Sequence, residues 1–404
     1  MSSITPPSGT YKDWPRRLGS YFPDNTKYLV GAFLLWRALL YLGAYVASTL
    51  TAANPTFAFA LPLSSVGEFL FGTWIHWDAA WYLRIIQEGY SYQGPGVQAS
   101  VAFFPLYPTL VTLLVRGLGL DANNYRAVAA AGIFVSNLAA LAGVLVLYRL
   151  TKYEWELRGV EQAEPLAFRT ALLFLFFPTT IFFATLYTEA LFACLVITSF
   201  FFLRRQQFVL GGLFGALASM CRVQGALLLI PFLVEYLQRW RFRPSRAALS
   251  FVLVPMGVVL YSGFLFFSFD EPLAFLRVQT APGWHGPGNA PFYDALGDIS
   301  NLLHNPTNVL LFLQVSYAVG LVVLVGLTLR YLPLSYGVYA VAAALLPISV
   351  DLVSIQRYTL GIFPIFMTLG LLSRSEMSFK LLMGLFVFML GVNTIMWING
   401  MWVG

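Results

Sequence analysis

The sequence predicts an all-α protein that crosses a membrane many times. Hydrophobic residues make up 58% of its 404 residues, charged residues only 10%, and the mean hydropathy is +0.72. A soluble domain carries about 25% charged residues. Apolar segments also recur along the chain between polar or basic stretches, as in polytopic membrane proteins. These segments predict a bundle of about 10–12 transmembrane helices.

The chain is expected to begin with a cytoplasmic tail, residues 1–27, followed by a single transmembrane domain, residues 28–404. The tail lacks a signal-peptide pattern, so the first transmembrane helix is expected to direct insertion. That helix is predicted at residues 28–50, because a span needs roughly 20 apolar residues. It contains Arg37, and an arginine in a span usually faces protein or a water-filled cavity.

A first outer loop is predicted at residues 51–100, on the non-cytoplasmic side. In this loop Trp74, Trp77 and Trp81 surround Asp78. Aromatic side chains at three- and four-residue spacing form one face of a helix, and tryptophan prefers the depth of the lipid headgroups. The loop is therefore expected to contain a short interfacial helix that holds a carboxylate at the boundary between lipid and water.

The remaining apolar segments differ in length. Several have only about 13–15 residues, which is marginal for crossing, so some are expected to be re-entrant. A second outer loop, residues 269–305, is rich in Gly and Pro. The predicted spans lie near residues 101–115, 127–148, 168–186, 190–203, 208–220, 226–237, 247–267, 308–329, 336–350, 358–372 and 379–398.

Residues 239–246 contain four arginines and no acid, so they are expected to lie in the cytoplasm. Counting spans from this anchor places Glu189 and Arg222 outside. Counting from a cytoplasmic N-terminus also places Asp78 outside, but the two counts then disagree. One of the segments between residues 101 and 148 must therefore be misassigned or must not cross fully.

Asp78 is the first candidate for catalysis. Position +4 holds Tyr82, so Asp78 lacks the i,i+4 partner that Arg84 has in Glu88. An acid without a partner in a partly dry, aromatic setting is a candidate general base. The alternative is an acid at a helix end that is satisfied by water or by backbone amides.

Three further ionisable residues lie at predicted outer ends or breaks of the spans. Arg357 is a candidate to grip a lipid phosphate, because a guanidinium suits phosphate oxygens; alternatively it snorkels or pairs with Asp351. Glu189 and Arg222 occupy breaks between apolar segments, and ionisable groups in membranes are functional candidates by default. They are equally expected to pair with each other.

No motif predicts a metal or nucleotide site. His76, His285 and His304 lie far apart, and Asp78 has no second acid in a DxD pair. The sequence also lacks a Walker A loop, a GxGxxG after a strand and a GxSxG. His285 lies in GWHGPGNAP, a flexible stretch that is a candidate cover for a lipid-bound substrate.

Four blocks follow one another along the chain. HWDAAWYLRIIQEGY is followed by AFFPLYP, and the later blocks are FFPTTIFFATLYTEALFA, ASMCRVQGALLLIP and QRYTLGIFPIF. Together they resemble the PIG-V-like mannosyltransferases, a branch of the GT-C membrane glycosyltransferases. EPLAFLRVQ also resembles a loop of bacterial relatives. The chain departs from the family at Thr188, where Ser is usual, at Val223-Gln224, where Ser-Asn is usual, and before AFFPLYP, where Gln98 and Ser100 stand and no Glu is present.

The resemblance implies a GT-C-type bundle and an inverting enzyme that moves a mannosyl residue from a polyprenyl-phosphate donor to an acceptor hydroxyl on the non-cytoplasmic face. By motif position, Asp78 is expected to be the general base. Arg357, with Arg222 second, is expected to stabilise the leaving phosphate. Further residues expected to bind the donor phosphate or substrate are Gln356, Tyr358, His285, Glu189, Trp77, Trp81 and His76. The expected partners are the lipid-linked donor, a glycan or glycolipid acceptor and the bilayer, with no metal, other cofactor or nucleic acid.

Three alternatives stay open. The same chemistry with another sugar, such as glucose, arabinose or galactose, fits the sequence equally, because no residue identifies the sugar. A proton-coupled lipid or solute transporter would use Asp78 and Glu189, although no internal repeat of the kind many transporters have is evident. The missing Glu before Ala102 leaves open a third interpretation, a non-catalytic relative that only binds lipid-linked sugars. Short loops and the EPLAFLRVQ block favour a prokaryotic plasma membrane, with the site facing outward.

Overall fold

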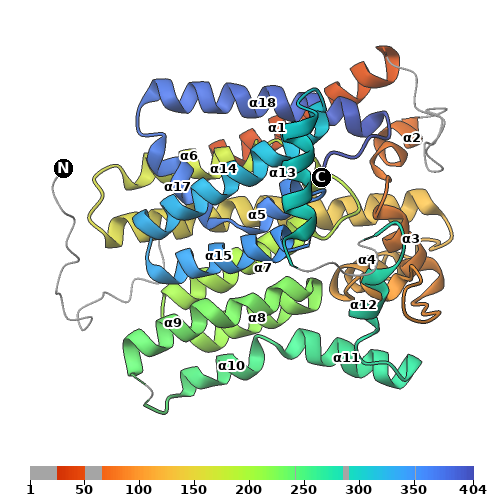
Figure 1. Ribbon diagram of the computed structural model, residues 1–404, viewed down its shortest axis with the longest axis horizontal. Coiled ribbons are helices and arrows are strands. Elements are labelled where there is room, and N and C mark those ends of the chain that lie inside the picture. Colours follow the sequence, from red (N-terminus) through yellow and green to blue (C-terminus); the bar gives the residue numbers. More distant parts are fainter. Residues whose placement is uncertain (1–24, 51–65, 242, 285–290, 351) are drawn as a thin grey trace.

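The computed structural model describes residues 25–50, 66–241, 243–284, 291–350 and 352–404. Within these ranges the chain is helical and contains no strand, which confirms the predicted all-α class. Most of the long helices lie side by side in one bundle, along the long axis of the molecule (Figure 1). The predicted tail and the predicted first outer loop lie partly outside the described ranges.

The helices that build the bundle are α1 (Asn25–Leu50), α5 (Tyr125–Leu157), α6 (Ala163–Leu175), α7 (Glu189–Arg204), α8 (Phe208–Cys221), α9 (Leu229–Trp240), α10 (Leu249–Leu253), α11 (Met256–Phe269), α14 (Val309–Tyr331), α15 (Leu334–Ile348), α17 (Pro364–Leu372) and α18 (Glu376–Ile398). Shorter helices near one end are α2 (Val66–Leu70), α3 (Ala79–Glu88), α4 (Leu106–Gly117), α12 (Ala274–Arg277), α13 (Tyr293–His304) and α16 (Ile355–Tyr358). Short 3-10 helices connect them at η1 (Gly72–Trp74), η2 (Ser100–Ala102), η3 (Thr180–Phe183), η4 (Val223–Leu228), η5 (Arg246–Ala248), η6 (Val278–Thr280) and η7 (Thr359–Gly361).

Within the described residues, four helices are long and apolar enough to cross a membrane: α1, α5, α14 and α18. Two bent pairs pass the same test when each is taken as one span, η5–α10 with α11 and α16–η7 with α17. The apolar helices α4, α8 and α15 are shorter. At 1.5 Å per residue, a helix of about 12 residues reaches only about 18 Å of the roughly 30 Å hydrocarbon core. The chain is an integral membrane protein, and several of its apolar helices are shorter than an ideal span.

A proline explains why three predicted single spans are broken, namely those at residues 168–186, 247–267 and 358–372. Pro178 follows the end of α6, Pro255 separates α10 from α11, and Pro364 begins α17. The axes bend by 40° between α10 and α11 and by 89° between η7 and α17. Proline lacks the N–H donor and disfavours a helical conformation for the residue before it. Hydropathy alone does not register this effect. The three segments are therefore interrupted helices, and the last two still pass as one span each when their parts are taken together.

Helix α4 begins and ends at the same end of the bundle. The loop after α4 returns to α3, where the Gln87 side chain donates to the Ala122 carbonyl over 3.1 Å. The next helix, α5, begins beside α2, where Arg126 pairs with Glu68. The 12 residues of α4 therefore do not cross the bundle. This is the segment, predicted at residues 101–115, that made the two span counts disagree.

The bundle has two distinct ends. The α3 end carries α2, α3 and α4 (Figure 1). The opposite end, which we call the basic end, is formed by the loops after α5, α7, α9, α14 and α17. It includes Arg204, Arg205, Arg239, Arg241, Arg243 and Arg246. Asn25 donates to Glu164 at the start of α6 over 2.7 Å, so α1 also begins at the basic end.

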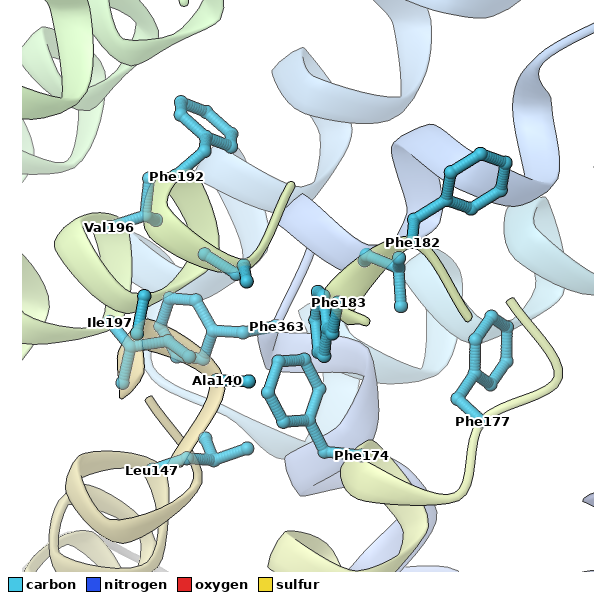
Figure 2. Packing of buried hydrophobic residues seen from close by; sticks show 14 of the residues in the cluster. Ala140, Leu147, Phe174, Phe177, Phe182, Phe183, Phe192, Val196, Ile197 and Phe363 are labelled. Carbon is cyan, nitrogen blue, oxygen red and sulfur yellow. The ribbon is translucent and has the colours of Figure 1, made fainter. Parts of the chain in front are cut away.

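Residues 176–188 join α6 to α7 inside the bundle without forming an α-helix. Every residue of this stretch is buried. Its side chains pack against the aromatic core, in which Phe174, Phe183 and Phe363 lie close together (Figure 2). The stretch therefore crosses the core as irregular backbone and delivers the first residue of α7.

Side chains from distant helices satisfy this irregular backbone. Non-helical backbone at membrane depth is tolerated only where protein or water satisfies its polar groups. Asn393 of α18 donates to the Pro178 carbonyl over 2.8 Å, and Arg37 of α1 donates to the Ala184 carbonyl over 3.2 Å. Arg37 thus faces protein, as expected for an arginine in a span.

Candidate active site

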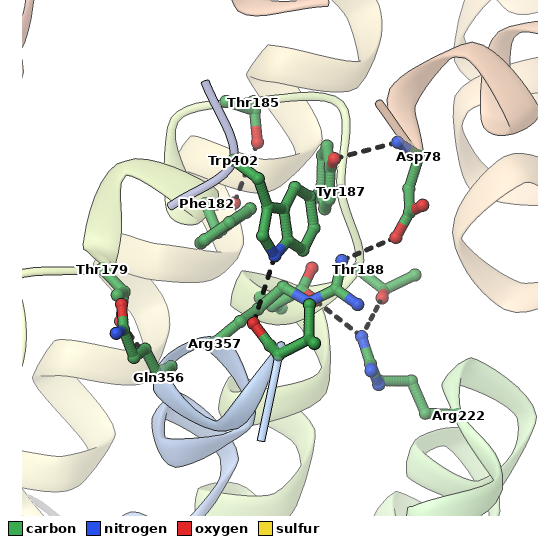
Figure 3. A network of polar contacts seen from close by, with 12 residues as sticks. Asp78, Thr179, Phe182, Thr185, Tyr187, Thr188, Arg222, Gln356, Arg357 and Trp402 are labelled. Carbon is green, nitrogen blue, oxygen red and sulfur yellow. Dashed lines mark hydrogen bonds and ion pairs between the residues drawn. The ribbon is translucent and has the colours of Figure 1, made fainter. Parts of the chain in front are cut away.

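Four ionisable side chains from separate segments meet at the α3 end, and we call them the charge cluster. Asp78 precedes α3, Glu189 is the first residue of α7, Arg222 follows α8, and Arg357 lies in α16. Each lies where a helix begins, ends or is interrupted. Figure 3 shows Asp78 and Arg357 pointing toward each other, with Arg222 on the adjoining segment.

Two acidic and two basic side chains alternate in this cluster, in the order Asp78, Arg357, Glu189 and Arg222. Arg357 Nη1 lies 2.6 Å from Asp78 Oδ2, and its Nε lies 3.4 Å from Glu189 Oε1. The same Glu189 oxygen lies 2.7 Å from Arg222 Nη1. Burying charges is unfavourable unless each has a partner of good geometry. The mutual pairing explains how four charged groups are accommodated among apolar helices, and it confirms the predicted Glu189–Arg222 pair.

Asp78 was expected to lack a partner, and that expectation is wrong. Its partner Arg357 is 279 residues away in the sequence, so local helical spacing gave no sign of it. Although Asp78 directly precedes α3, its side chain makes no capping hydrogen bond. Its side chain is 29% exposed against 9% for Arg357. The carboxylate is thus directed at a cation and remains reachable from outside the bundle.

Tyr187 and Thr188, which directly precede α7, make hydrogen bonds to residues of the cluster and its surroundings. The Tyr187 hydroxyl accepts from the Asp78 backbone N–H over 3.0 Å and donates to the His76 carbonyl over 3.1 Å. The Thr188 hydroxyl accepts from Arg222 Nη1 over 3.0 Å. The sequence did not single out these two residues as site residues, although both lie next to Glu189 in LYTEALF.

Trp402 covers Arg357 from the segment that follows α18. Its ring centre lies 5.0 Å from the Arg357 guanidinium carbon, and its indole N–H donates to the Val353 carbonyl over 3.2 Å. The ring also lies against Trp77, with centroids 5.6 Å apart. A cation over an indole face is favourable, more so where water is excluded. No sequence pattern marked Trp402, because a lone tryptophan beyond an apolar helix has no distinguishing spacing.

The three tryptophans around Asp78 do not share one helical face, contrary to the prediction. Trp74 belongs to η1 and is fully buried, whereas only Trp81 lies on α3. Between them, Trp77 has a φ of 55°, in the left-handed region. This turn breaks the helical spacing and sends the indoles in different directions. Helix α3 itself, with its amphipathic pattern, is the predicted short helix of the first outer loop.

Trp81 lies where the two predicted outer loops meet. Its ring stacks on Phe103 and contacts Trp284 of the second of these loops, with centroids 5.8 and 5.7 Å apart. Nearby, Gln98 donates to the Pro282 carbonyl over 3.0 Å, and Ser100 accepts from the Ser91 backbone N–H over 2.7 Å. Where the resemblance leads one to expect a Glu, this chain therefore has Gln98, which ties the two loops together, and Ser100, which holds the first loop to itself.

His76 is buried under the cluster. Its ring packs edge-on against Trp397 at 5.5 Å between centroids. Burial lowers the pKa of His76 to about 4, so the imidazole is neutral at neutral pH. The contact that His76 makes with the cluster is through its backbone carbonyl, which accepts from Tyr187.

The other predicted binding residues are placed differently. Tyr358 presents its ring to both guanidiniums, 5.3 Å from Arg222 and 5.4 Å from Arg357. Gln356 is buried and accepts a hydrogen bond from Thr179 through its backbone carbonyl. His285 and Asp351, the suggested partner of Arg357, lie outside the described residues.

A small pocket lies directly beside the charge cluster. Its charged wall is formed by Glu189, Arg222 and Arg357. Its apolar wall comes from α15, η7 and α7, through Phe192, Tyr339, Ala343, Pro347, Gly361 and Ile362. The cavity volume is about 30 Å³, close to the share of one liquid water. A larger ligand therefore needs side chains of this pocket to move.

The chemistry of this wall suits a phosphate ester. Two guanidiniums face one cavity, and guanidinium pairs bind phosphate oxygens through charge-assisted hydrogen bonds. Among the described residues, no three His, Cys, Asp or Glu side chains are close enough to hold a metal ion.

Known proteins resemble segments of the chain. Three proteins named GPI mannosyltransferase 2 match short segments, from Yarrowia lipolytica (32% identity over 153 residues, 37% of this chain and 41% of the relative), Cryptococcus neoformans var. neoformans (31% over 156 residues, 37% and 34%) and Drosophila melanogaster (32% over 125 residues, 29% and 24%). The matched segments span at most about two fifths of these relatives.

A solved structure shares the fold across most of the chain. ArnT from Cupriavidus metallidurans, bound to undecaprenyl phosphate, superimposes with a TM-score of 0.52 at 13% identity. The match covers 88% of this chain and 62% of ArnT. Identity this low reports on the fold alone, and it confirms the GT-C-type bundle.

The model of one protein family, described as mannosyltransferase (PIG-V), matches residues 26–245. This range covers more than half of the chain and includes Asp78, Glu189 and Arg222, whereas Arg357 lies beyond it. The chain therefore belongs to the PIG-V mannosyltransferase family.

Proposed function

We propose that this protein is an inverting mannosyltransferase that moves a mannosyl residue from a polyprenyl-phosphate donor to an acceptor hydroxyl at the α3 end of the bundle. The observation that carries the proposal is the ion pair between Asp78 and Arg357. Arg357 also pairs with Glu189, and Glu189 in turn pairs with Arg222. One acid that is reachable from outside thus lies next to Arg357, which lines a pocket together with Arg222.

These groups suit the two halves of the reaction. The acceptor oxygen attacks the anomeric carbon of the sugar while the bond from that carbon to the phosphate oxygen breaks. Asp78 takes the proton of the acceptor hydroxyl, because its carboxylate is the reachable acid of the cluster. Arg357 and Arg222 stabilise the negative charge that builds on the departing polyprenyl phosphate.

The Asp78–Arg357 contact adds an order to these events. The Arg357 guanidinium already pairs with Asp78, so a phosphate in the pocket would compete with Asp78 for its charge and its N–H donors. Donor binding would draw Arg357 toward the phosphate and free the carboxylate for the acceptor. The base would then become available only when a donor is in place.

The distribution of charge supports an orientation for the site. The four arginines of residues 239–246 lie at the basic end, and such loops favour the cytoplasmic side. The α3 end then faces the opposite side, where the charge cluster would meet an acceptor. We place the protein in a prokaryotic plasma membrane, with this end outward.

The nature of the donor is supported by what related proteins are called. The curated relatives carry the name GPI mannosyltransferase 2, and the ArnT structure contains undecaprenyl phosphate. These names support a mannosyl group and a lipid phosphate, respectively. The pocket beside two guanidiniums and an apolar wall fits such a donor by its chemistry.

The proposal is tested by incubating the purified protein in nanodiscs with polyprenyl-phosphate mannose and a panel of glycan and glycolipid acceptors, with products identified by mass spectrometry. The Asp78→Asn variant should form product at least about 100-fold more slowly, since general-base catalysis contributes about 10²–10⁴-fold. It should still bind the donor.

Glu88→Gln is the matched control, because Glu88 is an exposed acid on the same helix whose partner is Arg84. This variant should keep the rate of the parent protein. Unchanged transfer by Asp78→Asn, or no product from any mannosyl donor, would overturn the proposal. A proton-coupled transporter would instead lose substrate uptake in Asp78→Asn and form no glycosylated product at all.

A further inference from the structure

Glu189 has two carboxylate oxygens in different situations. Its side chain is only 5% exposed. Oε1 lies between the two arginines, 2.7 Å from Arg222 Nη1 and 3.4 Å from Arg357 Nε. Oε2 is buried as well, yet it has no hydrogen-bond partner among the described residues. The residue also lines the pocket.

An unsatisfied buried carboxylate oxygen is unusual and calls for an explanation. Buried polar atoms nearly always have a partner, and exceptions often mark a ligand or water site. The pairing of Oε1 fixes the position of the side chain, so the direction of Oε2 is also fixed before any ligand arrives. The structure therefore presents a buried, pre-oriented acceptor on a residue that lines the pocket.

The chemistry of the surroundings limits what this acceptor can bind. A phosphate oxygen is repelled by a carboxylate, so the phosphate belongs at Arg222 and Arg357. Oε2 instead requires a donor, such as an O–H group. A molecule that carries a hydroxyl close to a phosphate satisfies both requirements, and a glycosyl phosphate is such a molecule.

We propose that Glu189 Oε2 accepts a hydrogen bond from one hydroxyl of the donor sugar and thereby makes Glu189 a specificity-determining residue. This inference rests on the proposed function, because it assigns the sugar subsite of the same donor. Sites built to bind a hydroxyl discriminate strongly against analogues that lack it, since the partner group is then left buried and unpaired.

The test measures the affinity of the parent protein in nanodiscs for polyprenyl-phosphate mannose and for its three monodeoxy analogues at positions 2, 3 and 4. One of these analogues should bind about 10- to 100-fold more weakly, as expected for the loss of a hydrogen bond to a charged acceptor. In Glu189→Gln the affinity difference between the mannosyl donor and this analogue, which we call the deoxy effect, should fall to about 3-fold or less, because the amide is a neutral acceptor.

Thr188→Ala is the matched control. It removes the other hydrogen bond of Arg222 but leaves Glu189 in place. It should weaken binding of all four donors by the same factor and keep the full deoxy effect. If Glu189→Gln behaves in this way too, Glu189 only positions the arginines and the proposal is overturned.

Two further outcomes are informative. If the parent protein binds all three deoxy donors as well as the mannosyl donor, Oε2 contacts only a water, and the inference fails while transfer activity still upholds the proposed function. If no mannosyl donor binds, both fail. Should Glu189→Gln not fold, Glu189→Asp keeps the charge between the arginines but withdraws Oε2, and it should reduce the deoxy effect equally.

Discussion

Two groups of buried charges lie at opposite ends of the bundle, and they are satisfied to different degrees. The charge cluster lies at the α3 end. At the basic end, Arg204 of α7 lies between Glu154 of α5 and Glu235 of α9, and we call this group the Arg204 cluster. Both groups connect helices that are far apart in the sequence.

Among the described residues, no buried side-chain atom of the Arg204 cluster lacks a hydrogen-bond partner. Arg204 makes a two-pronged contact with Glu154, over 2.9 and 3.0 Å, and also pairs with Glu235. Tyr336 donates to Glu154 over 3.2 Å, and Ser335 donates to Glu235 over 2.6 Å. None of these side-chain atoms is among the buried ones that lack a partner.

The charge cluster differs in two respects. Glu189 Oε2 and Arg357 Nε are buried without a hydrogen-bond partner, and the residues lie at helix breaks beside a pocket rather than within regular helices. Fully satisfied polar networks rigidify a fold, whereas incompletely satisfied ones are costly unless a ligand completes them. The comparison assigns stability to the Arg204 cluster and binding to the charge cluster, and four predictions test this division.

Arg204→Met should have the largest effect on stability. It leaves Glu154 and Glu235 buried without their cation, and breaking a buried ion pair costs about 3–5 kcal/mol. Thermal unfolding in detergent should show a correspondingly lower midpoint, with donor affinity of the folded fraction unchanged. Arg205→Met is the control, since the neighbouring exposed Arg205 only stacks on Phe201 and Tyr153. A stable Arg204→Met protein with weak donor binding would reverse the assignment.

Arg357→Lys should act in the opposite sense. The ammonium keeps the positive charge beside Asp78 and Glu189 but loses the planar fork. Transfer should fall about 100-fold, in line with the loss of one donor to a developing anion, while the unfolding midpoint should change little. Single-turnover rates with saturating donor provide the measurement. A normal rate would remove Arg357 from the chemistry.

Titration of His76, which lies at the α3 end, should make the free energy of unfolding depend on pH. Its pKa of about 4 in the folded protein lies below the usual 6.5, because burial disfavours the imidazolium. Its neutral form thus contributes stability above pH 6.5 that is lost as the pH falls from 6.5 towards 4. Between pH 7 and 5 the loss should be about 2 kcal/mol.

His76→Phe provides the control for this prediction. Phenylalanine retains an aromatic ring against Trp397 but does not titrate. The unfolding free energies of parent and variant should therefore diverge between pH 7 and 5, as followed by chemical denaturation. Parallel curves would show that the imidazole is not buried as described.

Thr188→Ala should have the smallest effect. It removes one hydrogen bond to Arg222 and leaves the ion pair with Glu189 intact. The donor KM should rise about 3- to 10-fold with kcat nearly constant. A fall in kcat instead of a rise in KM would place Thr188 in contact with the reacting groups.

Hydropathy and motif position predicted the architecture, but not the partners within the site. Apolar periodicity located most helices, and α8 was predicted almost to the residue. The breaks at Pro178, Pro255 and Pro364 were missed, because a hydropathy window averages over them.

The site shows a similar limit. Asp78, Glu189, Arg222 and Arg357 were all singled out as ionisable groups in apolar surroundings. The Asp78–Arg357 pair was missed, because helical spacing reports only on partners three or four residues away. The positive φ of Trp77 broke the expected aromatic face, and nothing in the local sequence distinguished Trp402.

The irregular stretch at residues 176–188 constrains how the protein is made. Its carbonyl at Pro178 is satisfied by Asn393, which the ribosome adds 215 residues later. Bare carbonyls are not tolerated in hydrocarbon. During biosynthesis this stretch must therefore stay in water or beside the insertion machinery until α18 emerges. The segment that carries Tyr187 and Thr188 into the site is thus among the last parts of the nascent protein to reach its final position.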